Sequence, residues 1–516
     1  MLQMDKIGLE KKGFFTLLAG YFLQYLIGII AIRVLTTIIS PVEVGRINII
    51  VAVALFLNVF VNGLTVFIQR NLLEWNDRGL ARLYLVYYIC FMFFIGILGS
   101  WLVISLKQAL GINIKSIWLM SLIFGMSFFY NLNWVLIVWL NLFGRRFLFV
   151  LLSNITLLIS IVIPTIMALT MARTAENWIL GQILAQVFML ALSVYFLFKL
   201  LKPKEEKVVN ASFNRDFRGF CFKAYNFAWP INVTSLLAWL QTQAYRFILN
   251  VNSGLEVIGL FTIGFGMGFN FINRFEILFN QFYNPVFYKE LADSDTPDKK
   301  AAACNKFASY LIPAVLVLSI YIIVSSHFIA KVFVGDKFYA VTRVTIIWGV
   351  LFQLFFAVMT VYSLPGIAEQ NTKCFIWPNL GGTLVLITGV FFLSKFNPYW
   401  GTGIAMVIGS FATFILMRHK MKKVLRVYSP RRKILFSLIL SLPLVITMLA
   451  LQFLFPRPTV LESITILFFS VSYMLLIQMI LSRNWLFASI RLPFVDNIEQ
   501  KINTIYLPDF LKILEP

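Results

Sequence analysis

The chain has 516 residues, of which 60% are hydrophobic and only 13% are charged. Soluble domains have about 45–50% apolar and about 25% charged residues, so the composition excludes a soluble enzyme and predicts an integral membrane protein. The formal net charge of +22 would suit nucleic acid, but membrane topology explains the placement of the basic residues, and we expect no nucleic-acid partner.

Fourteen apolar runs are long enough to cross the roughly 30 Å hydrocarbon core of a bilayer. They cover residues 14–35, 46–68, 83–105, 115–141, 147–171, 177–198, 222–247, 257–281, 306–328, 340–364, 374–394, 400–419, 433–454 and 461–482. The first run is full length and lacks a small-residue cleavage site, so we interpret it as a transmembrane helix rather than a signal peptide. The runs predict an all-α protein with about 14 transmembrane helices.

The basic residues concentrate on one side of the predicted membrane. Of the 44 Lys and Arg residues, 32 belong to the two tails and the even-numbered gaps, 10 lie on the other side, and Arg33 and Arg274 lie within helices. Positive charge collects on the cytoplasmic side, so we expect both termini in the cytoplasm. The densest clusters, 199–223 and 418–433, are explained by topology and by contact with anionic lipid.

A repeated segment relates the two parts of the chain. The segment Arg33–Gly45 contains an Arg, a Ser and a Glu that recur 213 residues later in Arg246–Gly259, with the final glycine displaced by one more residue. Six predicted helices separate the two copies, an even number, so both halves enter the membrane in the same direction. Parallel repeats of this kind place a substrate site between the halves. A chance match is the alternative interpretation.

The repeat divides the chain into four parts. We expect a six-helix half over 1–205, a second six-helix half over 206–428, two additional transmembrane helices over 429–484, and a cytoplasmic amphipathic tail over 485–516. The tail mixes isoleucines with charges, which is typical of a helix that lies in the membrane interface or packs against cytoplasmic loops.

Three predicted helices, the second, the seventh and the eighth, carry polar side chains at helical spacing. Such side chains are costly in lipid, so they normally face a protein interior or a water-filled cavity. For the second helix, the alternative is hydrogen bonding between packed helices, worth about 1 kcal/mol or less per contact. The residues predicted to line a cavity are Asn58, Asn62, Asn232, Trp239, Gln243, Asn270 and Asn273.

Several short motifs carry a family resemblance. Arg33, the turn Ser40–Gly45 (SPVEVG), and the sequence Asn62–Leu64 followed by Arg70 resemble the Wzx-type polysaccharide flippases of the multidrug/oligosaccharidyl-lipid/polysaccharide (MOP) exporter superfamily. The likeness extends over the whole chain, including two extra C-terminal helices seen in some lipid-flipping members. It implies a MATE-like fold, with two parallel six-helix repeats followed by two helices.

The resemblance also implies a function. It implies transport of an undecaprenyl-pyrophosphate-linked oligosaccharide repeat unit, of O-antigen or another surface polysaccharide, from the cytoplasmic to the periplasmic leaflet of the bacterial inner membrane. Alternating access through a cationic central cavity would carry the substrate, without enzymatic activity, cofactor or metal ion. Membrane lipids and the lipid-linked glycan are the expected partners, together with a polysaccharide polymerase and chain-length proteins.

Three arginines within the predicted helices or at their outer ends are the candidate head-group ligands. A pyrophosphate is a compact anion with many acceptor oxygens, and an Arg presents a permanently charged fork of donors. We therefore expect Arg33, Arg246 and Arg274 to bind it, although Glu276 or Asn270 is an alternative partner for Arg274. The arginines expected to attract the head group at cytoplasmic helix ends, which topology alone also explains, are Arg70, Arg145 and Arg146.

Two rival functions make different demands on the sequence. A cation-coupled multidrug exporter of the same superfamily would use buried acids, whereas the predicted spans contain essentially one, Glu276. A membrane polysaccharide polymerase or ligase needs a site that is reachable from outside, and the predicted outer loops have about ten residues or fewer. They also carry no paired carboxylates or His–acid set.

Overall fold

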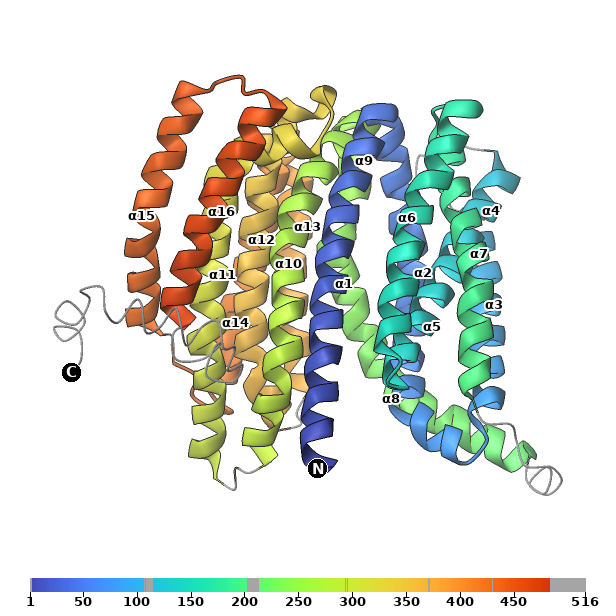
Figure 1. The fold of residues 1–516 in the computed structure, drawn as a ribbon. Helices are drawn as coiled ribbons and strands as arrows, with labels where there is room; N and C mark the ends of the chain where they lie inside the picture. Colours follow the sequence, from blue (N-terminus) through green and yellow to red (C-terminus); the bar gives the residue numbers. More distant parts are fainter. Residues whose placement is uncertain are drawn as a thin grey trace.

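The computed structural model describes residues 2–482 except 106, 108–114, 202–212, 293, 295, 370–371 and 429. The described residues form helices and connecting turns and contain no strand (Figure 1). The predicted amphipathic tail, 485–516, lies outside them, and so does most of the linker between the predicted halves. We call the face at which α1 begins the inner face, and the face at which α1 ends the outer face.

The N-terminal part of the chain forms seven helices and one π-helical turn, Met126–Tyr130. The helices are α1 (Leu2–Ile38), α2 (Pro41–Asp77), α3 (Ala81–Ser105), α4 (Ser116–Gly125), α5 (Asn131–Leu142), α6 (Arg146–Thr170) and α7 (Ala175–Leu200). The described residues from Phe213 onward form nine more α-helices and one 3-10 helix, Thr372–Phe375. The α-helices are α8 (Phe213–Gln243), α9 (Tyr245–Ser253), α10 (Leu255–Ala292), α11 (Pro297–Phe333), α12 (Asp336–Ala368), α13 (Ile376–Leu393), α14 (Pro398–Met421), α15 (Arg431–Leu454) and α16 (Val460–Ser482).

Among the described residues, thirteen helical stretches are long and apolar enough to cross a membrane, and they confirm the all-α membrane fold. The π-helical turn joins α4 and α5 into one of these stretches, Ser116–Leu142. The predicted run 222–247 is not among the thirteen. It falls on α8 and α9, which are separated at Ala244, and the polar side chains in this run lower its hydropathy.

Local sequence signals define several helix starts. Ser40 and Thr174 accept hydrogen bonds from the backbone amides of Glu43 and Asn177, three residues into α2 and α7. Asn397 accepts from the first amides of α14. A side-chain oxygen at this position satisfies an amide that has no partner within the helix. The short connections predicted between spans therefore end in caps that the sequence encodes.

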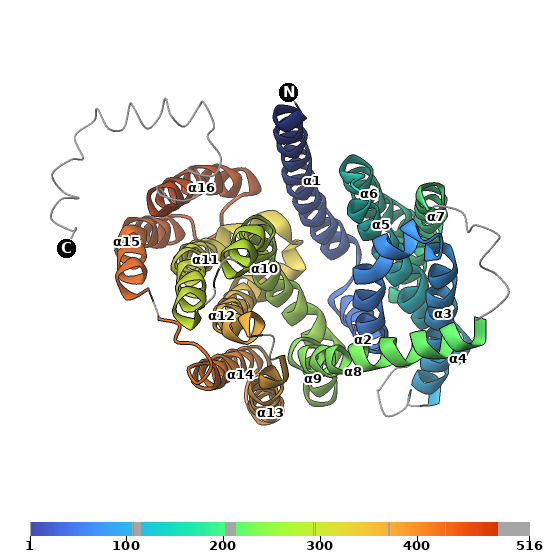
Figure 2. The same cartoon turned by 90° about the horizontal axis from the view of Figure 1, so that it is seen from below.

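Buried apolar side chains form two separate clusters. One lies within the first half toward the inner face and includes Leu72, Leu85 and Trp139. The other contains the buried core of α10–α14 together with outer-end residues of the first half, such as Ile39 and Val44. Within the described residues, the two predicted halves therefore share one core at the outer face and have separate cores toward the inner face. Figure 2 shows α2 lying beside α8, with α10–α14 on one side and α3–α7 on the other.

Candidate functional site between the two halves

Two glycines bring the outer ends of α2 and α10 together. A Cβ on Gly45 would lie 1.9 Å from the carbonyl oxygen of Leu255, and a Cβ on Gly259 would lie 1.9 Å from the carbonyl oxygen of Pro41. No larger residue fits at either position unless the backbones separate. These glycines end the two copies of the segment that repeats in the sequence, and their contacts are reciprocal. The repeated segment therefore closes the outer face between the halves.

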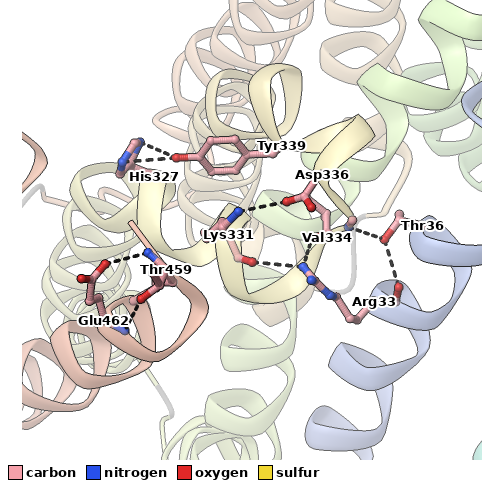
Figure 3. A network of polar contacts seen from close by, with 11 residues as sticks. Arg33, Thr36, His327, Lys331, Val334, Asp336, Tyr339, Thr459 and Glu462 are labelled. Carbon is pink, nitrogen blue, oxygen red and sulfur yellow. Dashed lines mark hydrogen bonds and ion pairs between the residues drawn. The ribbon is translucent and has the colours of Figure 1, made fainter. Parts of the chain in front are cut away.

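Arg33 bridges the halves at the same face (Figure 3). Its guanidinium Nη1 donates to the carbonyl oxygen of Lys331 at 3.1 Å and to that of Val334. The adjacent Thr36 hydroxyl accepts from the amide of Gly335 at 2.9 Å. The C-terminal carbonyls of a helix carry partial negative charge, so they attract a cation. The side chain that we expected to bind a head group thus caps the C-terminus of α11 in this conformation.

Arg246 corresponds to Arg33 in the repeat, but it belongs to the second predicted half and contacts the first. It lies at the start of α9, and its Nη1 donates to the carbonyl oxygen of Asn48 in α2 at 3.1 Å. Its guanidinium carbon is 5.7 Å from the centre of the Tyr245 ring, and its Nε is buried without a hydrogen-bond partner. Each repeat therefore contributes one arginine whose donors contact backbone carbonyls of the other half.

Two of the predicted cavity residues on α8 bind the backbone of α2. Asn232 accepts from the amide of Gly63 at 2.8 Å and donates to the carbonyl oxygen of Phe60 at 3.2 Å. The indole N–H of Trp239 donates to the carbonyl oxygen of Ala52 at 2.9 Å. These contacts are hydrogen bonds between packed helices, an alternative that the sequence suggested only for the second predicted helix. The role of Asn232 and Trp239 as cavity-lining residues stays a prediction.

Gln243, near the end of α8, is in a different position. Its Nε2 donates only to the neighbouring Thr242 hydroxyl at 3.3 Å, and its Oε1 is buried without a hydrogen-bond partner. A buried carbonyl oxygen without a donor is costly. Of the three predicted positions on α8, Gln243 therefore retains the capacity to bind a donor.

Arg274 has an exposed side chain although it belongs to the membrane-spanning stretch Leu255–Asn280 of α10. It is close enough to interact electrostatically with Tyr25 of α1 and with Tyr130 at the end of the π-helical turn. Neither of the two alternative partners holds it. Glu276, which is 6% exposed, accepts from Gln353 at 3.0 Å, and Asn270 donates to the carbonyl oxygen of Gly266 at 2.7 Å. Within the described residues, Arg274 makes no ion pair.

The remaining predicted residues lie on both sides of this region. Asn62 is exposed, and Asn58 and Asn273 are half-buried. These three side chains and the exposed Asn270 lie on α2 and α10, which are neighbours. Their role as cavity-lining residues stays a prediction.

The three predicted inner-face arginines are separate from Arg274. Arg70 is exposed, and its guanidinium carbon lies 5.9 Å from the centre of the Phe227 ring of α8. Arg145 and Arg146 follow Gly144, whose φ of 73° marks the turn before α6. These positions are consistent with surface charges, and their attraction of a head group stays a prediction.

The sequence did not identify every residue at this site. Tyr25 and Tyr130 are single tyrosines in apolar runs, and no spacing pattern distinguishes them from other aromatic residues. The carbonyl groups that Arg33 and Arg246 bind belong to the backbone, so their positions depend on how the helices pack. Glu43 does stand out in the repeat, and its carboxylate accepts from the amide of Ala175 at 2.7 Å, so it fixes the start of α7.

Comparisons with known proteins relate this chain to other proteins through its fold. A scan against protein-family models and a search of curated proteins each find no match. Among solved structures, the lipid II flippase MurJ in an inward closed conformation matches with a TM-score of 0.66 and 13% identity, covering 91% of this chain and 99% of MurJ.

Transporters of the MATE family also match. An inward-facing MATE transporter of the MOP superfamily gives a TM-score of 0.55 at 14% identity, covering 78% of this chain and 93% of the transporter. An outward-facing conformation of a MATE transporter gives 0.51 at 15% identity, covering 79% and 93%. The MurJ match covers more of this chain than either MATE match does. The chain therefore has the fold of MOP-superfamily transporters, over a length that corresponds to nearly all of the lipid II flippase MurJ.

Proposed function

We propose that this protein is a flippase that moves a polyprenyl-pyrophosphate-linked oligosaccharide repeat unit, of O-antigen or another surface polysaccharide, across the bacterial inner membrane. The observation that carries the proposal is Arg274, an exposed cation inside a membrane-spanning helix. Within the described residues it forms no ion pair, and it lies near Tyr25 and Tyr130 of the predicted first half. A charged side chain within a membrane span is costly, so it marks a substrate or ion pathway. The fixed positive charge selects an anionic substrate.

The chemistry of Arg274 suits a lipid pyrophosphate. The guanidinium offers five N–H donors in a planar fork and does not lose its proton at physiological pH. Charged hydrogen bonds to phosphate oxygens are stronger than neutral ones. Exposed amides on the neighbouring helices, at Asn62 and Asn270, supply the donors and acceptors that sugars require.

The contacts between the halves suggest how the substrate crosses. In this conformation the outer face is closed by the two glycines and by Arg33 and Arg246, while the cores are separate toward the inner face. Opening the outer face would break the carbonyl contacts of both arginines. Their freed guanidinium groups would then bind the pyrophosphate as it leaves Arg274. In this scheme the halves 1–205 and 206–428 move as two bodies.

The inner face is the cytoplasmic face in this proposal, with both termini there. The excess of Lys and Arg in the even-numbered gaps and tails supports this orientation. An anion that leaves an inside-negative cell is favoured by about 2.3 kcal/mol per charge per 100 mV, so the membrane potential would assist export. The expected partners are the lipid-linked glycan, membrane lipids, a polysaccharide polymerase and chain-length proteins.

The extent of the structural match supports a lipid-linked substrate. The two MATE matches given above cover 78% and 79% of this chain, whereas the match to MurJ, described as a lipid II flippase, covers 91%. The helices α15 and α16 pack against α11, outside the two halves. The chain thus resembles the flippase over a larger part of its length.

A cation-coupled exporter is the second candidate function, and one observation favours it. Glu276 is a buried carboxylate in a membrane span, and its hydrogen bond from Gln353 resembles the setting of a coupling acid. Its position two residues from Arg274 argues against a cationic drug as the substrate. Glu276 is compatible with proton coupling of anion transport. A membrane polymerase or ligase is the rival function of another class. If the protein had that function, its depletion would stop the polymerisation or ligation of glycan on the outer side of the membrane.

The test combines depletion with variants of Arg274. Depleting the protein should cause an oligosaccharide-linked polyprenyl pyrophosphate to accumulate in the cytoplasmic leaflet. Arg274→Gln should reproduce this accumulation at normal membrane abundance, while Arg274→Lys should retain part of the export because it keeps the charge. Arg343→Gln is the matched control, since Arg343 is an exposed arginine at the outer end of α12. Normal export by Arg274→Gln would contradict the proposal, and accumulation in the periplasmic leaflet would favour the polymerase or ligase.

A further inference from the structure

A second basic region lies at the inner face, away from Arg274. It is a cavity of about 900 Å³ between the end of α14 and the start of α15. The connection between these two helices lies at the edge of the molecule (Figure 2). Six of its nine lining residues are Lys or Arg, and none is acidic. The lining residues of this basic cavity are Arg418, Lys422, Arg426, Val427, Tyr428, Pro430, Arg431, Arg432 and Lys433.

Side chains of α11 hold the wall of the basic cavity in place. Asn305 accepts from the amide of Tyr428 at 2.6 Å and donates to the carbonyl oxygen of Arg426 at 3.4 Å. Lys433 donates to the hydroxyl of Ser309 at 3.3 Å, and its ammonium lies 4.6 Å from the centre of the Tyr310 ring. Orienting a membrane protein needs only positive charge near a helix end. It does not need a cavity whose lining backbone is held by hydrogen bonds from a neighbouring helix.

The cations of the basic cavity have no acidic partners. In the described part of the chain, no ion pair involves any of the six, and Arg418 Nε is buried without a hydrogen-bond partner. The start of α15, at Pro430, also lacks a side-chain cap, so its first amides add positive potential to the same cavity. Six like charges around one hollow repel each other, and a bound anion relieves that repulsion.

Apolar side chains continue from the cavity into the membrane. On α15, Leu435, Leu438 and Leu442 are 60%, 41% and 54% exposed and lie at spacings of three and four residues, on one face of the helix. On α14, Phe411 and Ile415 are 41% and 46% exposed. A free phosphate would use the cations alone. A lipid would use both the cations and the apolar surfaces that lead away from them.

We propose that the basic cavity binds the phosphate group of an anionic phospholipid of the inner-face leaflet, whose acyl chains lie along the exposed faces of α14 and α15. The site is separate from the one proposed for the transported substrate, and it does not depend on which substrate that is. The donors to the phosphate oxygens come from Arg426, Arg431 and Arg432, whose guanidinium groups make no hydrogen bond or ion pair within the described residues. Lys433 and Arg418 are held by contacts to aromatic rings, 4.6 Å from Tyr310 and 5.4 Å from Tyr362.

Native mass spectrometry of the full-length protein in neutral detergent would test this proposal. Phosphatidylglycerol and phosphatidylcholine with identical acyl chains are titrated at constant ionic strength. We expect tighter binding of phosphatidylglycerol, and a loss of at least about tenfold in its affinity in Arg426→Gln/Arg431→Gln, because charged hydrogen bonds are removed. Phosphatidylcholine binding should stay the same. The variant Arg426→Lys/Arg431→Lys, which keeps the charge, should retain the preference.

The matched control is Lys420→Gln/Lys423→Gln. It removes two charges from the same connection, at exposed positions that do not line the cavity, and it should bind phosphatidylglycerol like the parent. Equal losses in both double variants would overturn the proposal in favour of general surface attraction. Full displacement of the lipid by an equal concentration of inorganic phosphate would overturn it in favour of a free-anion site. Size-exclusion profiles matching the parent show that the variants are folded.

Discussion

Gly259 faces Gly45 across the outer end of the molecule so closely that a Cβ on Gly259 would lie 2.9 Å from the backbone nitrogen of Gly45. The two residues end the two copies of the repeated segment, one on α10 and one on α2. The repeat found in the sequence thus has a physical role, because both copies need a glycine where α2 and α10 meet. The outer closure is therefore sensitive to single methyl groups.

Gly45→Ala and Gly259→Ala should open the outer face. The added methyl overlaps a backbone carbonyl, and overpacking of this kind costs about 1–3 kcal/mol. We expect a cysteine at position 62, in a background without the native cysteines, to react faster with a membrane-impermeant maleimide applied from the outer side. Gly28→Ala is the matched control, since nothing lies within 4 Å of a Cβ at that position of α1. Equal labelling in all three variants would exclude the glycine contact as the outer closure.

Arg33→Ala and Arg246→Ala should each reduce export at least about tenfold, because a charged hydrogen bond is worth about 1.5–3 kcal/mol. Arg246→Lys should recover part of the export, since an ammonium keeps the charge and loses the fork. The measurement is accumulation of untranslocated lipid-linked oligosaccharide, with membrane abundance checked in parallel. Normal export by both alanine variants would remove these arginines from the transport mechanism.

The maleimide experiment separates two roles for these arginines. If they only close the outer face, both alanine variants will label position 62 faster, and added pyrophosphate will not change the labelling rate. If they also bind the head group, we expect the parent but not the alanine variants to be protected by a soluble pyrophosphate.

Asn62→Asp should reduce export without lowering the amount of protein. Asn62 is exposed on α2, and an acid there would repel an anionic head group in a region of low dielectric constant. Asn62→Gln is the control, because it preserves the amide and adds no charge. Full activity of Asn62→Asp would place this side chain outside the transport path.

The orientation can be tested with topology reporters. Fusions at Lys422 and at Lys207, which lies outside the described residues, should report a cytoplasmic location, and a fusion at Asn252 should report a periplasmic one. This expectation follows from the 32 basic residues assigned to the cytoplasmic side. A periplasmic signal at Lys207 would contradict both the orientation and the number of spans before that position.

Much of the architecture was predictable from local properties of the chain. The length of an apolar run indicates a membrane helix, because backbone polar groups in lipid must find their hydrogen-bond partners within the same segment. Ser40 and Thr174 indicate helix starts through caps that need only three neighbouring residues. The segment that begins at Arg33 and recurs at Arg246 was also visible, since a repeat is a property of the sequence.

The tertiary structure decided which partner each polar side chain has. Asn232 looks the same in the sequence whether it faces a cavity or the backbone of α2, and only the packing of α8 places it 2.8 Å from the amide of Gly63. Arg33 reaches carbonyls about 300 residues away because the outer face is closed. Such contacts depend on long-range packing and on the conformational state, so periodicity and composition do not encode them individually. Arg274 differs from these residues because the sequence alone singles it out. A charge in a membrane span is costly however the helices pack.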